Sequence, residues 1–258
     1  MKFYVFESGS KGNSTLITSN DRYIMIDNGL SIKKTKQKLK EANITIENVE
    51  ALLLTHSHTD HIAGINAFSD EIIYSTKFTY KMTRVEHQLV PFKEYEIAGF
   101  KITCIPTSHD SQGSCGFIIK VDNETLVYIT DTGYIYERVV DMIMDATYYI
   151  FESNHNVRML MNTNRPQTLK KRIMGDYGHL SNEDSANYLC DVIGNNTKEI
   201  VLAHLSEEAN SPDQAMIDLI EVFEERGIDN TKYLIRCASQ TSTLIGGEVE
   251  EVVWLISN

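Results

Sequence analysis

Several residue types are scarce in this 258-residue chain, and each scarcity excludes a class of protein. Four prolines and 14 glycines are too few for a collagen-like or low-complexity chain. The longest apolar runs, such as residues 51–54, are far shorter than the roughly 18 residues of a membrane span. The four cysteines include no Cys-x-x-Cys pair, and the first residues are typical of a strand rather than a leader. We therefore expect a cytoplasmic protein with reduced thiols and no membrane partner.

Positive charge is scarce as well, which bears on a nucleic-acid partner. The chain has 24 Lys and Arg against 36 Asp and Glu, a net charge of −12, and this disfavours phosphate binding by the surface as a whole. The charge is unevenly spread, because residues 31–40 hold five lysines and no acid. Residues 153–175 also lack acids and hold Arg158, Arg165, Lys170, Lys171 and Arg172. Each run alone also fits a solvated helix face.

Strand and helix patterns follow one another along the chain without a repeat or a linker. Strands are predicted for the first half at residues 2–6, 15–18, 22–26, 51–54 and 72–75. Strands of the second half are predicted at residues 100–106, 116–121, 125–130, 147–151, 199–203 and 233–237. Helices are predicted at residues 31–42, 186–193 and 212–226. We predict an α/β fold with central sheets and outer helices, formed by residues 1–258 as one domain.

The histidines are the clearest indication of a functional site in the sequence. Seven of the eight histidines lie at strand ends or in turns, and only His87 has an ordinary helical context, which we assign to the surface. The predicted strand 51–54 continues directly into His56-x-His58-x-Asp60-His61. Two histidines one residue apart in an extended loop point the same way and suit one metal ion, while Asp60 and His61 suit a second. Burying these groups without a metal would leave several polar atoms unpaired.

This loop resembles the signature of the metallo-β-lactamase-fold hydrolases, and later strand ends match the other ligand positions of that family. His109, Asp131 and His204 each follow a predicted strand. The resemblance implies that one metal is held by His56, His58 and His109, and the other by Asp60, His61 and His204, with Asp131 as the bridge. It also implies a four-layer αβ/βα sandwich with the dimetal site at the sheet edges.

Further stretches resemble the YycJ/WalJ-like branch of that family. They are residues 8–14, 151–156, 178–182 and 204–212, and Asn156 is a small departure where an aspartate is common. The branch implies a 5′→3′ exonuclease activity on DNA. The alternatives are a small-molecule hydrolase of the same fold (a cyclic-phosphate diesterase or a thioesterase), a di-iron redox protein and a pure binding module. The last two are disfavoured, because His58 stands where the redox group has a carboxylate and all seven ligand positions are intact.

Substrate and supporting residues follow from position. The loop with Ser10, Lys11 and Asn13 is either a turn or a phosphate cradle, and Ser181 is a helix cap that also suits an anion. His155 and His179 are equal candidates for proton donor or phosphate clamp. Buried carboxylates at two strand ends, Asp27 and Glu152, are expected to orient metal ligands. The acid-free run is expected to form one wall of a DNA groove, with Arg158, Arg165, Lys170, Lys171 and Arg172.

The expected cofactors are two divalent cations, manganese or zinc, with iron also compatible with histidine and aspartate ligands. Two such ions about 3.5–4 Å apart lower the pKa of a shared water to about 7. Asp60, a catalytic candidate as well as a ligand, and Asp131 bring two negative charges against four positive ones. The site therefore stays cationic and suits a phosphodiester. The oligomeric state is left open.

Overall fold

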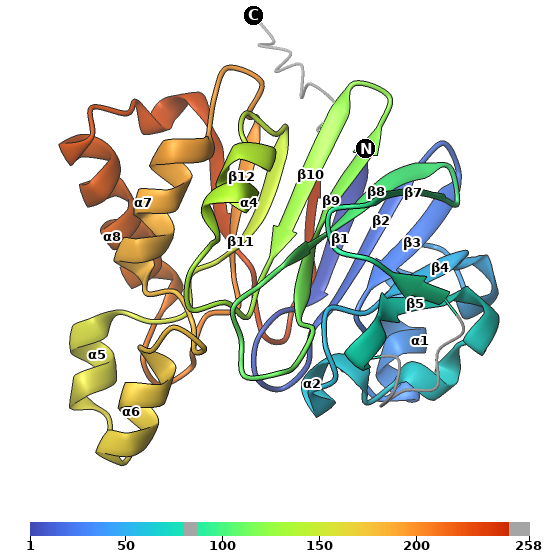
Figure 1. Cartoon of the computed structure of the whole chain (residues 1–258), viewed down its shortest axis with the longest axis horizontal. Helices are drawn as coiled ribbons and strands as arrows, with labels where there is room; N and C mark the ends of the chain where they lie inside the picture. Colours follow the sequence, from blue (N-terminus) through green and yellow to red (C-terminus); the bar gives the residue numbers. More distant parts are fainter. Residues whose placement is uncertain (80–86, 248–258) are drawn as a thin grey trace, which may run out of the picture.

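The computed structural model describes residues 1–79 and 87–247. Two mixed seven-stranded sheets lie face to face, with helices on their outer sides (Figure 1). The first sheet has the order β14 (Leu244–Gly247), β1 (Lys2–Glu7), β2 (Ser14–Ser19), β3 (Arg22–Ile26), β4 (Ala51–Leu53), β5 (Ile73–Thr76) and β6 (His87–Leu89). The second has the order β13 (Leu234–Cys237), β12 (Glu199–Ala203), β11 (Tyr148–Glu152), β10 (Glu124–Ile129), β9 (Cys115–Val121), β8 (Phe100–Pro106) and β7 (Glu94–Ile97).

Three apolar layers hold the sheets and helices together. Alternate strand residues such as Phe3 and Val5 of β1 meet Phe117 and Tyr128 of the second sheet in the central core. The opposite faces of both sheets pack against helices, which gives the four layers of an αβ/βα sandwich and confirms the predicted fold. The helices are α1 (Ile32–Glu41), α2 (Thr59–Ile62), α4 (Glu137–Met142), α5 (Val157–Asn162), α6 (Gln167–Ile173), α7 (Asn182–Val192) and α8 (Pro212–Glu225).

Most predicted elements are present, and the structure adds the helices α2, α4, α5 and α6 and three strands at the sheet margins. Ser181 caps α7 through its side-chain oxygen and Pro212 opens α8, as the sequence predicts. Ser31 caps α1 in the same way. The added strands are the short β6, β7 and β14. The helical context predicted for His87 is wrong: this residue begins β6, where its exposed ring stacks on Tyr74. No helix in residues 1–79 and 87–247 is long and apolar enough to cross a bilayer.

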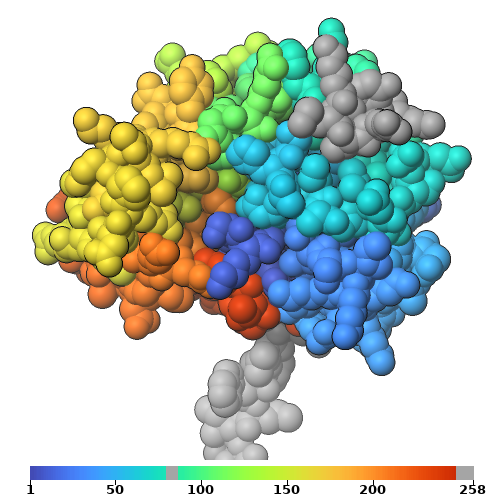
Figure 2. All heavy atoms as spheres, turned by 90° about the horizontal axis from the view of Figure 1, so that it is seen from below, coloured from blue at the N-terminus to red at the C-terminus, as the bar shows by residue number. Residues whose placement is uncertain are grey.

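Parallel pairing brings the chemical residues to one edge of the sandwich. Strands β3 and β4 of the first sheet run parallel, as do β10, β11 and β12 of the second. Their carboxyl ends therefore meet at the same edge. Asp27, Asp131 and His204 follow three of these strands with φ between 55° and 58°. Such left-handed backbone is uncommon outside glycine and clusters at functional sites. Figure 2 shows this edge face-on, with segments distant in sequence meeting at its centre.

Candidate metal centre

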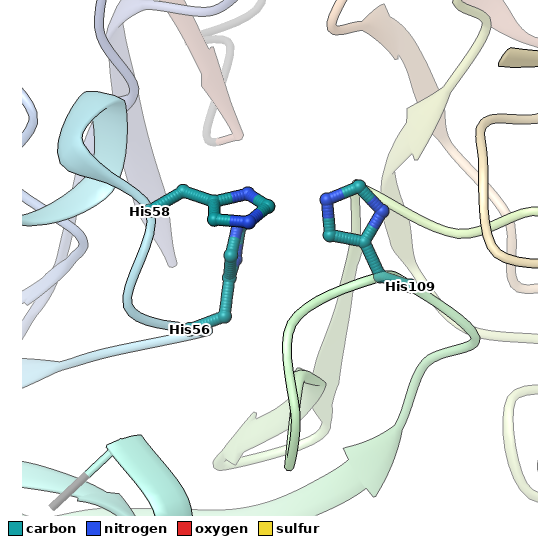
Figure 3. A group of neighbouring side chains, drawn as sticks. All are labelled: His56, His58 and His109. Atoms are coloured by element: carbon teal, nitrogen blue, oxygen red, sulfur yellow. The ribbon is translucent and has the colours of Figure 1, made fainter. Parts of the chain in front are cut away.

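Three histidine rings from two loops surround a common point. His56 and His58 belong to the loop between β4 and α2, and His109 belongs to the loop after β8 (Figure 3). The ring centroid of His56 is 4.6 Å from that of His58 and 5.1 Å from that of His109. One ring nitrogen from each residue lies within 4.8 Å of the other two. Three imidazoles at such spacing match the ligand set of a transition-metal ion.

A second group of ligand atoms lies beside the first, with Asp131 between them. Asp60, His61 and His204 also bring ligand atoms within 4.8 Å of one another. The Oδ2 atom of Asp131 is 3.3 Å from His61 Nε2, and its Oδ1 atom is 3.7 Å from His109 Nε2. One carboxylate thus faces both groups, which is the arrangement expected of a bridging ligand.

Unpaired buried atoms show that these residues fit divalent cations. His56 Nε2, His204 Nε2 and Asp131 Oδ2 are all buried and have no hydrogen-bond partner in the described part of the chain. Leaving such an atom unsatisfied costs about 1–3 kcal/mol. All three atoms belong to the predicted ligand set, and coordination by a metal ion removes this cost. The donor set contains only imidazole and carboxylate, which suits zinc, manganese and iron alike.

Two buried carboxylates turn the ligand rings toward the centre. Asp27 Oδ2 lies 2.7 Å from His61 Nδ1 and accepts from the Thr55 hydroxyl at 2.7 Å. Glu152 Oε1 lies 2.9 Å from His204 Nδ1. Because both contacts occupy Nδ1, the Nε2 atom of each ring faces the cluster, where His61 Nε2 also lies 2.9 Å from Asn13 Nδ2. These contacts agree with the orienting role expected of Asp27 and Glu152 and identify His61 and His204 as their partners.

Charges in the cluster outweigh the effect of burial on the pKa values of His61, His204 and Asp131. Burial lowers the pKa of His61, but the carboxylates of Asp27 and Asp131 raise it to about 9. Burial acts likewise on His204, whose pKa Asp131 and Glu152 raise to about 9. Burial raises the pKa of Asp131, but His204 and His61 hold it well below its ordinary value. At neutral pH the metal-free His61 and His204 therefore carry protons, which a divalent cation must displace. Burial instead lowers the pKa of His56 and His109.

Comparisons with known proteins identify the family of this chain. A sequence profile of the β-lactamase superfamily domain matches residues 22–205. Exodeoxyribonuclease YycJ of Bacillus anthracis is 34% identical, over 88% of this chain and 90% of its own length. Exodeoxyribonuclease WalJ of Streptococcus pneumoniae is 32% identical, over 85% and 87%. The chain belongs to the YycJ/WalJ branch of the metallo-β-lactamase superfamily.

A solved structure agrees with this membership at the level of the fold. The metallo-β-lactamase fold protein YhfI of Bacillus subtilis matches with a TM-score of 0.71. The match covers 95% of this chain and 99% of YhfI at 18% identity. Together with the family match, it confirms the predicted fold family and the predicted enzyme class, a hydrolase of this superfamily.

The two proton-donor candidates, His179 and His155, lie in different parts of the structure. His179 Nδ1 lies 2.8 Å from Glu152 Oε1 and 3.8 Å from Asp131 Oδ1, so His179 borders the metal centre. His155 is buried, and neither of its ring nitrogens has a hydrogen-bond partner among residues 1–79 and 87–247. It lines a different cavity of about 660 Å³ between α5, α7 and α8, which none of the predicted metal ligands lines. Burial and the charge of His179 lower the pKa of His155 to about 4.

The acid-free run does not form a continuous basic wall. The prediction that Lys170 forms part of the groove wall is wrong. Its side chain is buried, and its Nζ atom donates to the carbonyls of Met161 and Thr163 at 2.7 and 2.8 Å. Arg158 faces the cavity of His155, where carboxylates disfavour phosphate. Those carboxylates belong to Glu183, Asp218, Glu221 and Glu225.

The remaining basic residues of the run differ in their surroundings. Lys171 is exposed on α6. Arg165 pairs with Glu208 at 2.9 Å, and Arg172 pairs with Asp110. Arg165 and Arg172 lie near His109 and His179 in a smaller pocket. Among the basic residues of the run, Arg165 and Arg172 are thus the two that lie near the metal centre.

The predicted phosphate-binding residues also differ in their exposure and in their distance from the metal centre. Ser10 and Lys11 are exposed, and Lys11 pairs with Glu207 at 2.7 Å. Asn13 is buried, with its Nδ2 atom 2.9 Å from His61 Nε2, so it borders the metal centre from inside. The Ser181 hydroxyl donates to Asp184 at 2.6 Å and serves the helix cap.

One residue at the site was missed at the sequence level. Asp110 Oδ1 lies 3.6 Å from His58 Nε2 and 3.4 Å from His109 Nε2. The other oxygen of Asp110 accepts from Arg172. The available signal was its position directly after His109, within the same strand-end turn.

Proposed function

We propose that this protein is a two-metal-ion phosphodiesterase that degrades DNA in the 5′→3′ direction, with manganese or zinc as its metal. The observation that carries the proposal is the set of three unpaired, buried ligand atoms at a histidine and aspartate cluster. The names of the two relatives that align along most of the chain support DNA as the substrate and exonuclease as the activity. The small-molecule alternative is not favoured, because both relatives are named for DNA hydrolysis.

The proposed ligands are the seven residues found at the two groups. One metal would be held by His56, His58 and His109, the other by Asp60, His61 and His204, and Asp131 would contact both. Bound divalent cations supply Lewis-acid activation of water and of the scissile phosphate. Asp60 and Asp131 contribute only two negative charges, so the centre keeps the positive charge that a phosphodiester requires.

Residues around the ligands supply the proton transfer. His179 is the proposed general acid, which gives the departing 3′-oxygen its proton. Glu152 holds Nδ1 of His179 at 2.8 Å, so that Nε2 is left to donate. The positive charges of His179 and His204 outweigh burial and lower the pKa of Glu152 to about 2. This assigns to His179 the role that the sequence left open between two histidines.

We also propose the setting in which the enzyme acts. The four cysteines are all free thiols, which fits the reducing cytoplasm where DNA substrates are found. Residues 1–258 are proposed to act as one domain, because the two halves each contribute ligands to a single centre.

Two end-labelled strands test the proposed activity. A single-stranded DNA labelled at its 5′ end should release a labelled mononucleotide early in the reaction with Mn²⁺ or Zn²⁺. The same strand labelled at its 3′ end should shorten gradually, and a chelator should stop both reactions. Release first from the 3′ end would overturn the direction. Hydrolysis of a small bis-phosphodiester reporter without any DNA hydrolysis would overturn the substrate.

A further inference from the structure

A small cationic pocket adjoins the metal centre. It encloses about 170 Å³ and is lined in part by His109 and His179, with Arg165 and Arg172 from the α5–α6 region. Arg172 Nε and Nη2 contact Asp110, and no carboxylate of the described residues contacts its Nη1 group. Pockets for whole drug-sized ligands measure about 300–1,000 Å³. This pocket therefore suits the phosphate and sugar of a nucleotide, and the base must lie outside it.

An exposed tyrosine stands where that base would lie. Tyr177 lines the pocket, and its exposed fraction of 65% is the highest among the large apolar and aromatic residues of the described chain. Large aromatic residues are usually buried well beyond this. Tyr136, 36% exposed, is close enough for its pKa to respond to Tyr177 and packs its ring against Tyr134 at 4.9 Å. The edge of the pocket is therefore aromatic as well as cationic.

The loop that carries Tyr177 is fixed to the metal-ligand loops. The carbonyl of Gly178 accepts from His109 Nδ1 at 3.2 Å. Gly133, two residues after Asp131, lies against the same loop so closely that a Cβ atom would be 2.3 Å from the Asp176 carbonyl oxygen. Both contacts fix the backbone on either side of Tyr177 to the loops that carry the proposed ligands His109 and Asp131. Tyr177 is therefore held beside the metal centre and is not only exposed.

We propose that Tyr177 stacks on the base of a nucleotide adjacent to the scissile phosphate, while Arg172 and Arg165 contact the phosphate in the pocket. This inference rests on the proposed DNA hydrolase function and adds a substrate class, an unpaired DNA end. A base within a duplex is covered on both faces by its neighbours and must be unstacked at a cost of a few kcal/mol before a ring can cover it. Base stacking on an aromatic side chain is worth about 1–3 kcal/mol and tolerates every sequence.

An enzyme–substrate cycle tests the stacking contact. All measurements are made with Mn²⁺. The Kd is measured on single strands with hydrolysis-resistant phosphorothioate linkages, and kcat/KM is measured on ordinary strands. Each strand carries either all of its bases or an abasic site at the first or the second nucleotide. The variants are Tyr177→Ala, Tyr177→Phe and, as a matched control, Ile217→Ala, which removes an exposed apolar side chain of α8.

The expected results follow from the stacking energy. Tyr177→Ala should weaken binding of the intact single strand roughly 5- to 150-fold, whereas Tyr177→Phe and Ile217→Ala stay within about twofold. An abasic site at one of the two positions should cause a similar loss in wild type and almost none in Tyr177→Ala, because the base then has no ring to stack on. The preference of kcat/KM for single-stranded over blunt duplex DNA should shrink in Tyr177→Ala and stay at the wild-type level in Ile217→Ala.

Two contrary results are distinguishable. Independent, multiplicative losses from the variant and from both abasic strands would overturn the stacking proposal and leave DNA hydrolysis intact. Absence of DNA hydrolysis by wild type would overturn the proposed function instead. In that case the binding cycle still decides whether Tyr177 contacts a base.

Discussion

Replacing Glu152 by Gln removes one charge from the centre of the proposed proton-transfer machinery and keeps the size of the side chain. Glu152 Oε1 contacts Nδ1 of both His179 and His204, at 2.8 and 2.9 Å, and Oε2 accepts from the amide of Thr132 at 2.8 Å. The carboxylate thus accepts on both oxygens. An amide has only one accepting oxygen, so its NH₂ group must face either the two imidazoles or the Thr132 N–H.

The magnitude follows from the two histidine hydrogen bonds that the substitution weakens. A hydrogen bond to a charged group contributes about 1.5–3 kcal/mol, which at His179 corresponds to roughly 10- to 150-fold in rate. Removing the partner that orients a ligand such as His204 changes metal affinity or activity by about 10–100-fold. We therefore expect kcat of Glu152→Gln to fall roughly 10²–10⁴-fold, the range of a lost acid–base catalyst.

Single-turnover hydrolysis of end-labelled single-stranded DNA, with the metal content measured in parallel, checks this expectation. Asp218→Asn is the matched control, because Asp218 also accepts from side-chain amides, Asn156 and Asn182 at 2.8 Å, but lies in the cavity away from the predicted ligands. Its kcat should stay near that of wild type. A Glu152→Gln enzyme with wild-type metal content and kcat within threefold of wild type would refute the assigned role.

Three further predictions address the other assignments. His179→Ala should lose about 10²–10⁴-fold in kcat with its metals retained, whereas His155→Ala should stay within threefold in a pH–rate series. Replacing Lys171 and Arg172 by Ala should flatten the log–log dependence of DNA affinity on salt by about 0.7 for each phosphate that is no longer neutralised, measured against the control pair Lys36 and Lys40 of α1. Burial raises the pKa of Glu124, but hydrogen bonds from the Met1 amine, Tyr148 and Lys198 outweigh it and lower the pKa below 4.5. Its stabilisation is therefore present above pH 4.5 and lost as pH falls below it, so Glu124→Gln should lower Tm at pH 7 and flatten the acid limb of a melting series.

The sequence could indicate where the clustered residues lie, because they follow buried strands. Parallel strands of one sheet bring their carboxyl ends to one edge, so His56 lies at that edge of the first sheet and His204 at that edge of the second. How the two sheets face each other, which brings the two histidines together, depends on the tertiary fold. The same reasoning fails for His155, which also follows a strand. The chain turns there into α5, and the direction of a side chain after a turn depends on the helices packed around it.

Two other misses have different physical causes. Lys170 was assigned to the wall of a DNA groove, but it lies three residues before the buried Ile173 and shares its face of α6, a spacing that pointed inward. Asp110 acquires its surroundings only in three dimensions, because Arg172 lies 62 residues away. Tyr177 also could not be distinguished from a packing tyrosine, since exposure of one aromatic ring depends on the tertiary fold.

The central claim is that one bridging carboxylate joins two metal sites that hydrolyse DNA, and Asp131 tests it most directly. Elemental analysis of the purified wild-type protein should give two divalent metals per chain. In Asp131→Ala both sites should lose occupancy, since the side chain faces His61 of one group and His109 of the other, and hydrolysis of end-labelled single-stranded DNA should fall with it. A variant that keeps two metals per chain and full DNA hydrolysis would contradict the account.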